Sequence, residues 1–405
     1  MTKLRMKKSL LSVLLLWVCC LTWACSKEEP AVQAMEQESA GGDTGADTDE
    51  PVAPDAMPEP TGVSTQITPN LVNPNATAEA KQVYDVLRYL YGRKAISGTV
   101  AHVNWNIREA QNVHEWTGKW PAINVFDYMQ MWASKEVNPK GWLDYRNVDD
   151  AINWWKEGGL VGCMWHWNVK ANNGTDWTST PGTESGQTSF SPARAIEEGT
   201  PENKQALKDI DQVAGYMKLL ADKNIPILWR PLHEAAGNST EFEGGKAWFW
   251  WGADGPEVYV KLWRLLYNRL VNYHGLNNLI WIWNSQMNDA AWYPGNEYVD
   301  IVGRDNYEAL QYPLMKEFKQ LSTEYPAKIV TLAECGNGDE VKMSKWSKIW
   351  AEGSRWSWFM TWYDYDYNEG KKAAEDHQFA NPEWWKDAWE SGVVVDREEM
   401  KKLLK

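Results

Sequence analysis

Short, continuously apolar runs recur along the chain from about residue 80, separated by longer segments with helical spacing. The runs are apolar at successive positions rather than at alternate ones, which is the pattern of strands buried on both faces. Such strands belong to parallel sheets that are covered on both sides. Eight runs predict strands over residues 94–98, 121–126, 160–165, 225–230, 278–283, 299–303, 328–333 and 356–362.

The segments between these runs predict helices. Residues 201–222 are the clearest case, because Thr200 is a capping residue, Pro201 takes the first helical position, and the apolar positions keep helical spacing. The segment 256–274 repeats the design, with a proline at its start and Gly275 after its end. Further helices are predicted near residues 147–157, 313–325, 341–351 and 382–390.

Eight strands alternating with helices predict an α/β fold of the (β/α)8 or TIM barrel type, as one domain over residues 67–405. A doubly wound open sheet is the alternative, but no glycine-rich phosphate loop follows the first strand. In a barrel, functional residues stand at the C-terminal ends of the strands and in the loops that follow.

Two glutamates stand at such positions. Glu234 follows the fourth apolar run and Glu334 follows the seventh. These two strands face each other across the mouth of a closed barrel. Glycoside hydrolysis uses paired carboxyl groups across a cleft, one kept protonated by a raised pKa and the other ionised. Retaining enzymes hold the two groups about 5–5.5 Å apart and inverting enzymes about 6.5–9.5 Å apart.

Three segments make the match more specific: Trp229-Arg-Pro-Leu-His-Glu234, Trp248-Phe-Trp-Trp-Gly252 and Ala333-Glu-Cys-Gly336. Together they resemble glycoside hydrolase family 26, over about residues 78–395. That family consists mostly of endo-β-1,4-mannanases, which use retaining chemistry on a (β/α)8 barrel. The resemblance implies that Glu234 is the general acid/base and Glu334 the nucleophile in hydrolysis of mannan, galactomannan or glucomannan.

The resemblance also implies a set of residues around the two acids. His233 would bind the sugar in the −1 site and orient Glu234. A hydroxyl of Tyr307 donating to Glu334 would keep that carboxylate ionised and aimed. The other implied substrate-binding residues are His166, Trp248, Asp305, Trp362, Trp177 and His102. One departure is the segment 235–245, which is longer than the family pattern and would alter the aglycone side of the cleft.

The first 24 residues are typical of an export signal. Four basic residues precede an apolar run over 10–21, which is too short to span a membrane. Ala24-Cys25 resembles a lipoprotein cleavage site, so Cys25 is expected to carry a lipid. Ser26-Lys-Glu-Glu29 resembles the signal by which Bacteroidetes send lipoproteins to the outer face of the outer membrane; a plain acidic tether or a periplasm-facing anchor is the alternative. Residues 25–66 are expected to form a disordered acidic linker.

Composition adds two observations. The chain has 28 tryptophans against 7 phenylalanines. The flat apolar face and N–H of indole suit sugars, although tryptophan can also fill a core. The net charge is −14, and residues 26–60 hold ten acids against one lysine, so much of it is local. An excess of acids argues against nucleic acid as a partner.

The cysteines and histidines of the chain do not form the patterns of a disulfide framework or a metal site. Cys163 and Cys335, the cysteines outside the signal and the anchor, are expected to be buried thiols rather than a disulfide framework. The six histidines show no H-x-H or H-E-x-x-H spacing, so no metal or cofactor is expected and a metal-dependent hydrolase is a distant alternative.

Three functions therefore stay open. The first is a β-1,4-mannanase, expected to be a monomer whose only membrane contact is its lipid anchor. The second applies the same mechanism to a mixed-linkage β-glucan (a lichenase) or to β-1,3-xylan. The third is a catalytically silent surface glycan-binding protein, which would use the tryptophans but would not need both glutamates.

Overall fold

The computed structural model describes residue 57 and residues 59–237, 247–307, 311–338 and 341–405. The expected signal peptide, Cys25, most of the acidic linker and most of segment 235–245 lie outside the described residues. All described elements belong to one unit, residues 56–405. None of the helices in the described part of the chain combines the length and the apolarity needed to cross a bilayer.

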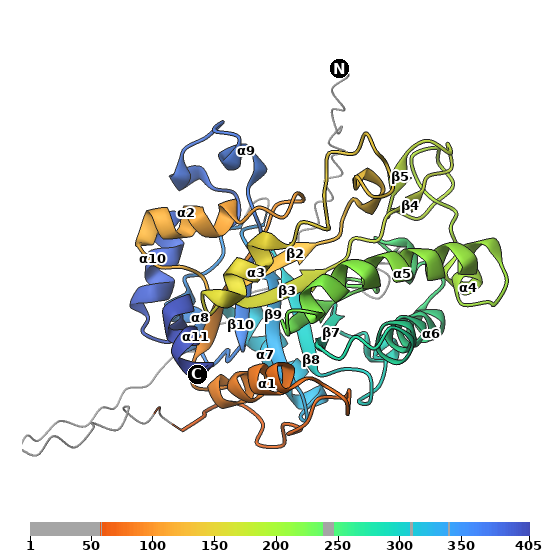
Figure 1. Ribbon diagram of the computed structural model, residues 1–405. Helices are drawn as coiled ribbons and strands as arrows, with labels where there is room; N and C mark the ends of the chain where they lie inside the picture. The colour runs from red at the N-terminus through yellow and green to blue at the C-terminus, as the bar shows by residue number, and fades with distance from the viewer. Residues whose placement is uncertain (1–56, 58, 238–246, 308–310, 339–340) are drawn as a thin grey trace, which may run out of the picture. The chain divides into compact units, whose positions relative to one another are not determined.

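Eight parallel strands form a closed barrel, with helices packed around it (Figure 1). The sheet runs in the order β10-β9-β8-β7-β6-β3-β2-β1, and β1 pairs with β10 to close it, with Ile96 opposite Trp358. The strands are β1 (Ala95–Val100), β2 (Ile123–Asp127), β3 (Leu160–Met164), β6 (Ile227–Arg230), β7 (Leu279–Ser285), β8 (Ile301–Asn306), β9 (Ile329–Cys335) and β10 (Trp358–Thr361).

All eight predicted strands are confirmed, and the closure between β1 and β10 contradicts the doubly wound alternative. Some strands are shorter than the apolar runs. The run at 225–230 becomes β6 only from Ile227, whose N–H donates to Asn278 O at 2.8 Å. Pro226 lacks an N–H and cannot contribute a donor to the ladder.

The predicted helices are present, with two differences in extent. The Thr200 hydroxyl caps α5 by accepting from Asn203 N at 3.0 Å, and Gly275 has the left-handed φ of 68° that suits the residue after a helix. The segment after α6 continues as a π-helix, η3 (Asn268–Tyr273), and α8 is shorter than the predicted 341–351. The helices are α1 (Ala78–Leu90), α2 (Arg108–Thr117), α3 (Asp149–Lys156), α4 (Pro192–Ala195), α5 (Pro201–Ala221), α6 (Pro256–Tyr267), α7 (Gln311–Glu324), α8 (Trp346–Ala351), α9 (Tyr365–Asn368), α10 (Pro382–Glu390) and α11 (Arg397–Leu403).

Several smaller elements decorate the barrel. A hairpin after β3 pairs Val169 with Thr178, and a short strand near the C-terminus adds to the start of β1. These elements are β4 (Val169–Lys170), β5 (Trp177–Thr178), β11 (Val394–Val395), η1 (Met131–Ala133), η2 (Trp250–Gly252), η4 (Ala290–Trp292) and η5 (Ala374–Asp376).

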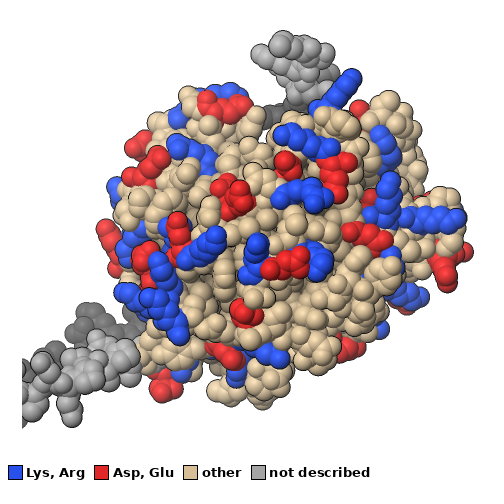
Figure 2. Space-filling view, in the orientation of Figure 1, with Lys and Arg blue, Asp and Glu red and all other residues tan. Residues whose placement is uncertain are grey.

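Tryptophan fills much of the core. Among the described residues, twelve tryptophans are less than 2 % exposed, so much of the excess over phenylalanine is packing rather than a sugar-binding surface. Cys163 and Cys335 are buried and unpaired, as expected. Lysine, arginine, aspartate and glutamate side chains intermingle on the face shown in Figure 2.

Candidate active site

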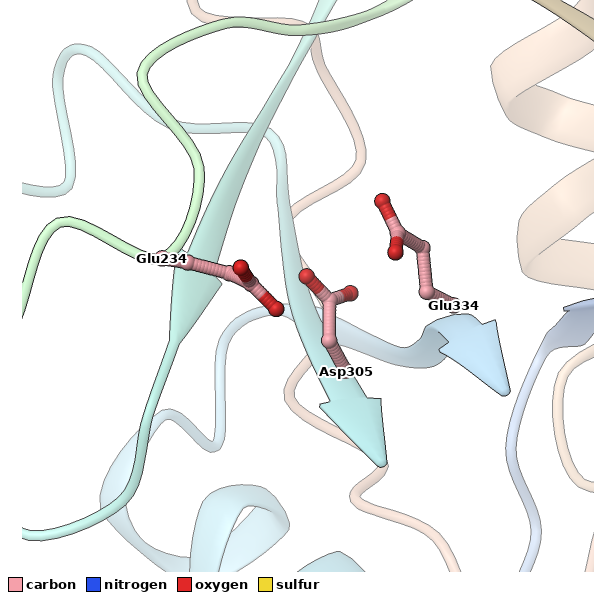
Figure 3. Close-up of side chains that lie close together, drawn as sticks. All are labelled: Glu234, Asp305 and Glu334. Carbon is pink, nitrogen blue, oxygen red and sulfur yellow. The ribbon is translucent and has the colours of Figure 1, made fainter. Parts of the chain in front are cut away.

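Three carboxyl groups meet at the C-terminal mouth of the barrel. Glu334 lies on β9, Asp305 on β8, and Glu234 four residues beyond the end of β6. Their side chains point toward one another (Figure 3), and one oxygen of each lies within 4.8 Å of the others. A register shift between Arg304 and Asp305 sets Asp305 directly opposite Glu334.

The turn that carries Glu234 has a strained backbone and is held by contacts with a neighbouring segment. Leu232 and Glu234 have φ angles of 48° and 51°, in the left-handed region that costs energy for residues with a Cβ. The indole of Trp251 donates to His233 O at 2.9 Å, and a Cβ on Gly252 would lie 1.9 Å from Ala235 O. The Trp248–Gly252 segment therefore packs directly on this turn and fixes where the Glu234 side chain begins.

A buried arginine binds two of the acids. Arg230, the last residue of β6, is 3 % exposed and donates to Asp305 at 2.9 Å and also to Glu334. It also donates to Oδ1 of the Asn284 side chain at 3.2 Å. Because a buried charge must be paired, Arg230 favours the ionised form of its partners. The three carboxyl groups are close enough to hold a metal ion, but Arg230 already supplies a cation to two of them, so the donor set fits a metal poorly.

Glu334 receives a second donor. The hydroxyl of Tyr307, just beyond β8, donates to Oε2 of Glu334 at 2.5 Å. Burial first, and then the charge of Glu334, raises the pKa of Tyr307 well above its ordinary value. The phenol therefore keeps its proton and remains a donor. Arg230 and Tyr307 together donate to both oxygens of Glu334 and so fix the orientation of its carboxyl group.

Glu234 has opposite surroundings. Desolvation, followed by the negative charges of Asp305 and Glu334, raises the pKa of Glu234 well above its ordinary value, although Arg230 acts against this. Burial also raises the pKa of Asp305, to about 7, against the effect of Arg230. The surroundings of Glu234 therefore favour its protonated form, while Glu334 is bound by donors. Environments that differ in this way separate the roles of an acid and a nucleophile.

Two histidines lie beside the carboxyl groups. His166 Nδ1 lies 2.5 Å from Oδ2 of Asp127, the last residue of β2, and its Nε2 lies 3.1 Å from His233 Nε2. Burial lowers the pKa of His166, but the charge of Asp127, its hydrogen bond to the ring and the charge of Glu334 together outweigh burial, and the net shift is upward. Burial and then Arg230 lower the pKa of His233 well below its ordinary value. His166 is accordingly the donor and His233 the acceptor between them.

Aromatic side chains next to His166 extend the site. Trp362, directly after β10, has its ring 6.1 Å from His166 and stacks on Tyr363, whose ring lies 4.7 Å from His102. The ring centroid of Phe249 lies 5.6 Å from that of His166. The sequence-predicted residues His102, His166, His233 and Trp362 thus lie in one connected group.

Trp248 and Trp177, which the sequence also predicted as substrate-binding residues, have no ring contact with this group among the described contacts. Trp248 is 43 % exposed and adjoins Phe249 in the chain. Trp177, on β5, stacks on Trp132 at 6.2 Å under Lys170, and lines a cleft of about 630 Å³ whose lining includes none of the three carboxyl groups.

Sequence reasoning missed three residues that shape the site. Arg230 lies inside the Trp229–Glu234 segment, and Asp127 ends the second barrel strand, so the rule of polar residues at strand ends would have found both. Phe249 lies inside the Trp248–Gly252 segment, but its apolar ring gave no chemical signal.

A closed barrel with two glutamates of opposite environment at its C-terminal mouth is the arrangement of the (β/α)8 glycoside hydrolases. The chain belongs to glycosyl hydrolase family 26, whose family model matches residues 72–387.

Relatives and solved structures agree with this assignment. A mannan endo-1,4-beta-mannosidase of Thermothelomyces thermophilus is 37% identical over 342 residues, or 83% of this chain and 64% of that protein. Mannan endo-1,4-beta-mannosidase A of a Piromyces species is 37% identical over 309 residues, or 74% of this chain and 46% of that protein. This chain thus spans less than two thirds of the length of either relative.

Solved structures of family 26 enzymes also superpose on this chain. The crystal structure of the GH26 domain of an endo-beta-mannanase/endo-beta-glucanase from Prevotella bryantii superposes with a TM-score of 0.74 at 38% identity, covering 82% of this chain and 99% of that one. A GH26 beta-(1,4)-mannanase of Podospora anserina superposes with a TM-score of 0.68 at 32% identity, covering 86% of this chain and 72% of that one.

Proposed function

We propose that this chain is a retaining endo-β-1,4-mannanase that hydrolyses internal bonds of mannan, galactomannan or glucomannan. The observation that carries the proposal is the pair Glu234 and Glu334, with oxygens within 4.8 Å and unequal surroundings. This spacing supports the short separation of retaining enzymes, about 5–5.5 Å, over the 6.5–9.5 Å or so of inverting ones. The names of the two curated relatives support the substrate class.

The mechanism is a double displacement. In the first step the Glu334 carboxylate attacks the anomeric carbon, the glycosidic bond breaks, and protonated Glu234 gives its proton to the departing oxygen. In the second step the Glu234 carboxylate takes a proton from water, which attacks the same carbon and releases Glu334. The environment of Glu234 favours the protonated form needed first, and the donors on Glu334 stabilise it as a leaving carboxylate.

The surrounding residues divide between the two sides of the cleavage point in this proposal. His166, His233, Asp305 and Trp362 form the −1 site, with the Trp362 ring as its floor. His102 extends that side through Tyr363. Trp248, next to Phe249, contributes to the aglycone side, and Trp177 to a more distant part of the cleft.

A substrate panel tests the activity. The purified chain is expected to shorten galactomannan and glucomannan with a spread of intermediate product lengths, as endo action requires. Cleavage of lichenan or β-1,3-xylan with no action on mannans would replace the substrate class. Binding of these glycans without cleavage of any would replace the enzyme with a glycan-binding protein.

Paired variants tie the activity to the site. Glu334→Gln is expected to abolish hydrolysis while mannan binding persists. Glu202→Gln removes a glutamate that binds Arg194 on the surface, and is expected to leave the rate unchanged. Equal rates for the two variants would contradict the assignment of Glu334.

We further propose that the protein is a monomeric lipoprotein on the outer face of the outer membrane. The support is the sequence pattern of residues 1–24, the Ala24-Cys25 pair, the Lys-Glu-Glu motif and the acidic segment up to residue 66. An enzyme on the cell surface meets polysaccharides that are too large to enter the cell.

Labelling and accessibility experiments test this location. Cells fed a radiolabelled fatty acid are expected to label the wild-type chain but not Cys25→Ser, and external protease is expected to remove the protein from intact cells. Labelled but protease-protected protein would mean a periplasm-facing anchor. An unlabelled wild type would contradict the lipid anchor. The molar mass of the released protein, measured by light scattering, tests whether it is a monomer.

A further inference from the structure

The connection between β10 and α10, residues 362–381, contacts the candidate active site at both of its ends. At one end the Trp362 ring lies 6.1 Å from His166. At the other end the Phe379 ring meets Tyr307 edge-on, with ring centroids 5.7 Å apart and planes at 66°. Tyr307 in turn donates to Glu334. The conformation of this connection therefore bears on the nucleophile proposed above.

A buried histidine organises the far end of this connection. His377 Nδ1 accepts from the backbone N–H of Phe379 at 3.3 Å and of Ala380 at 3.2 Å. A nitrogen that accepts carries no proton, so the ring proton is on Nε2. That nitrogen lies 2.8 Å from Oε1 of Glu109 on α2, and both side chains are fully buried. The facing carboxylate selects the tautomer that leaves Nδ1 free to accept.

Further contacts hold Glu109 and the connection together. The Asn368 amide donates to Glu109 Oε2 at 3.0 Å and to Asp364 O at 2.8 Å. Asp364 accepts from Gln378 N at 2.5 Å. A polar cluster of this kind, buried away from the proposed catalytic residues, costs stability unless every member is satisfied, so its presence calls for a role.

Phe379 also packs on the chain that follows Glu334. Asn337 N donates to Phe379 O at 3.0 Å, and the Asn337 amide donates to Gln378 O at 2.8 Å. A Cβ on Gly336, two residues after Glu334, would lie 2.8 Å from Phe379 Cβ, so the two segments are in close contact. The turn at 377–380 thus contacts both Tyr307 and the end of β9.

We propose that His377 is a positioning residue for the hydrolysis: its Nδ1, in the tautomer that Glu109 selects, holds the turn at 377–380, which keeps Phe379 against Tyr307 and the Tyr307 hydroxyl on Glu334. This inference rests on the proposed function for its kinetic consequences, but not for its structural ones. His377 itself touches no reacting group.

Two substitutions of His377 separate its two contacts. In His377→Asn the side-chain oxygen can replace Nδ1 as the acceptor for the turn, whereas His377→Gln reaches toward Glu109 but offers no acceptor at the Nδ1 position. We expect His377→Gln to lower kcat on mannan about tenfold or more, the effect of weakening one hydrogen bond to a charged group, with little change in KM. His377→Asn is expected to retain most of the wild-type kcat.

A double-mutant cycle distinguishes positioning from general stability. In a Tyr307→Phe background, His377→Gln is expected to add little further loss of kcat, because the hydroxyl that it positions is absent. His274→Gln is the matched control, since His274 also lies against a carboxylate, at 2.7 Å from Asp211, but on the outside of the barrel. It is expected to leave kcat unchanged.

A crystal structure of His377→Gln supplies a readout that needs no substrate. The expected result is a displaced Phe379 ring and a Tyr307 hydroxyl out of hydrogen-bond distance of Glu334. An undisturbed contact between Tyr307 and Glu334 would overturn the inference, as would fully additive losses in the cycle. A wild type inactive on mannan would contradict the proposed function instead, and the crystallographic result would still decide the role of His377.

Discussion

Asp305→Asn is expected to move the basic limb of the pH–activity profile to lower pH. In the proposed mechanism this limb reports the loss of the proton from Glu234. Desolvation, and then the charges of Asp305 and Glu334, raise the pKa of Glu234. Removing the Asp305 charge lowers the pKa of Glu234, and it also leaves Arg230 less neutralised, which acts in the same direction. Glu234 then loses its acidic proton at a lower pH.

The magnitude follows from the geometry. The two carboxyl oxygens lie within 4.8 Å. A unit charge at that distance, at an effective dielectric constant of about 20, contributes about 3.5 kcal/mol, or about 2.5 pH units. Asp305 has a pKa of about 7, so its charge is only partly present near neutral pH, and Arg230 offsets part of it. The expected shift is therefore about 1 unit, and the full, unscreened charge would give about 2.5.

The assay measures kcat/KM on a soluble glucomannan across the pH range, because the pH dependence of kcat/KM reports the pKa values of the acid and base in the free enzyme. Asp289→Asn is the matched control. Asp289 is a buried carboxylate bound by Ser285 and Gln286, and it contacts neither glutamate in the described contacts. The basic limb of the pH–activity profile of Asp289→Asn is expected to stay where it is in the wild type. A basic limb that stays fixed or moves to higher pH in Asp305→Asn would refute the electrostatic reasoning.

Three further predictions follow from single contacts. Tyr307→Phe removes the donor to Glu334, worth about 1.5–3 kcal/mol for a charged acceptor, so kcat should fall about 10- to 150-fold in steady-state kinetics with little change in KM; an unchanged kcat would contradict the contact. Gly252→Ala pushes a methyl group against Ala235 O, next to the turn that carries Glu234, so kcat should fall and the free energy of unfolding in urea should fall by about 1–3 kcal/mol. A wild-type rate would show that this contact does not fix the position of the turn. Thr200→Ala removes the cap of α5 and should cost about 0.5–2 kcal/mol of unfolding free energy with kcat unchanged; a lost rate would mean that α5 reaches the site.

The barrel was predictable from sequence because its strands are buried on both faces. Continuous apolar runs located all eight, and capping signals located α5 at Pro201. The helix α2 was missed for a physical reason. Its buried face consists of Glu109, Ala110, Asn112 and Val113, so few apolar residues mark the helix in the sequence, and the buried Glu109 and Asn112 face His377 and Asn368. Those partners lie more than 250 residues away, where sequence spacing gives no signal.

The site was predictable in part. Strand ends and a family resemblance identified Glu234, Glu334 and Tyr307. The pairing of His166 with Asp127 and of Arg230 with two acids depends on how neighbouring strands are registered in space. A register shift between β8 and β9, at which Ala333 is the extra residue on β9, sets one of those registers. The abundance of tryptophan was a misleading guide, because the same side chain fills the core as readily as it stacks on a sugar.

The central claim is that Glu334 is the nucleophile and Glu234 the acid/base of a retaining hydrolase. The measurement that tests it most directly is the anomeric configuration of the product formed by Glu234→Ala in the presence of azide, on a β-mannobioside with a good leaving group. With the nucleophile intact, azide attacks the glycosyl-enzyme in place of activated water, and NMR is expected to show a β-mannosyl azide. An α-mannosyl azide would mean that Glu234 is the nucleophile, and it would contradict the account.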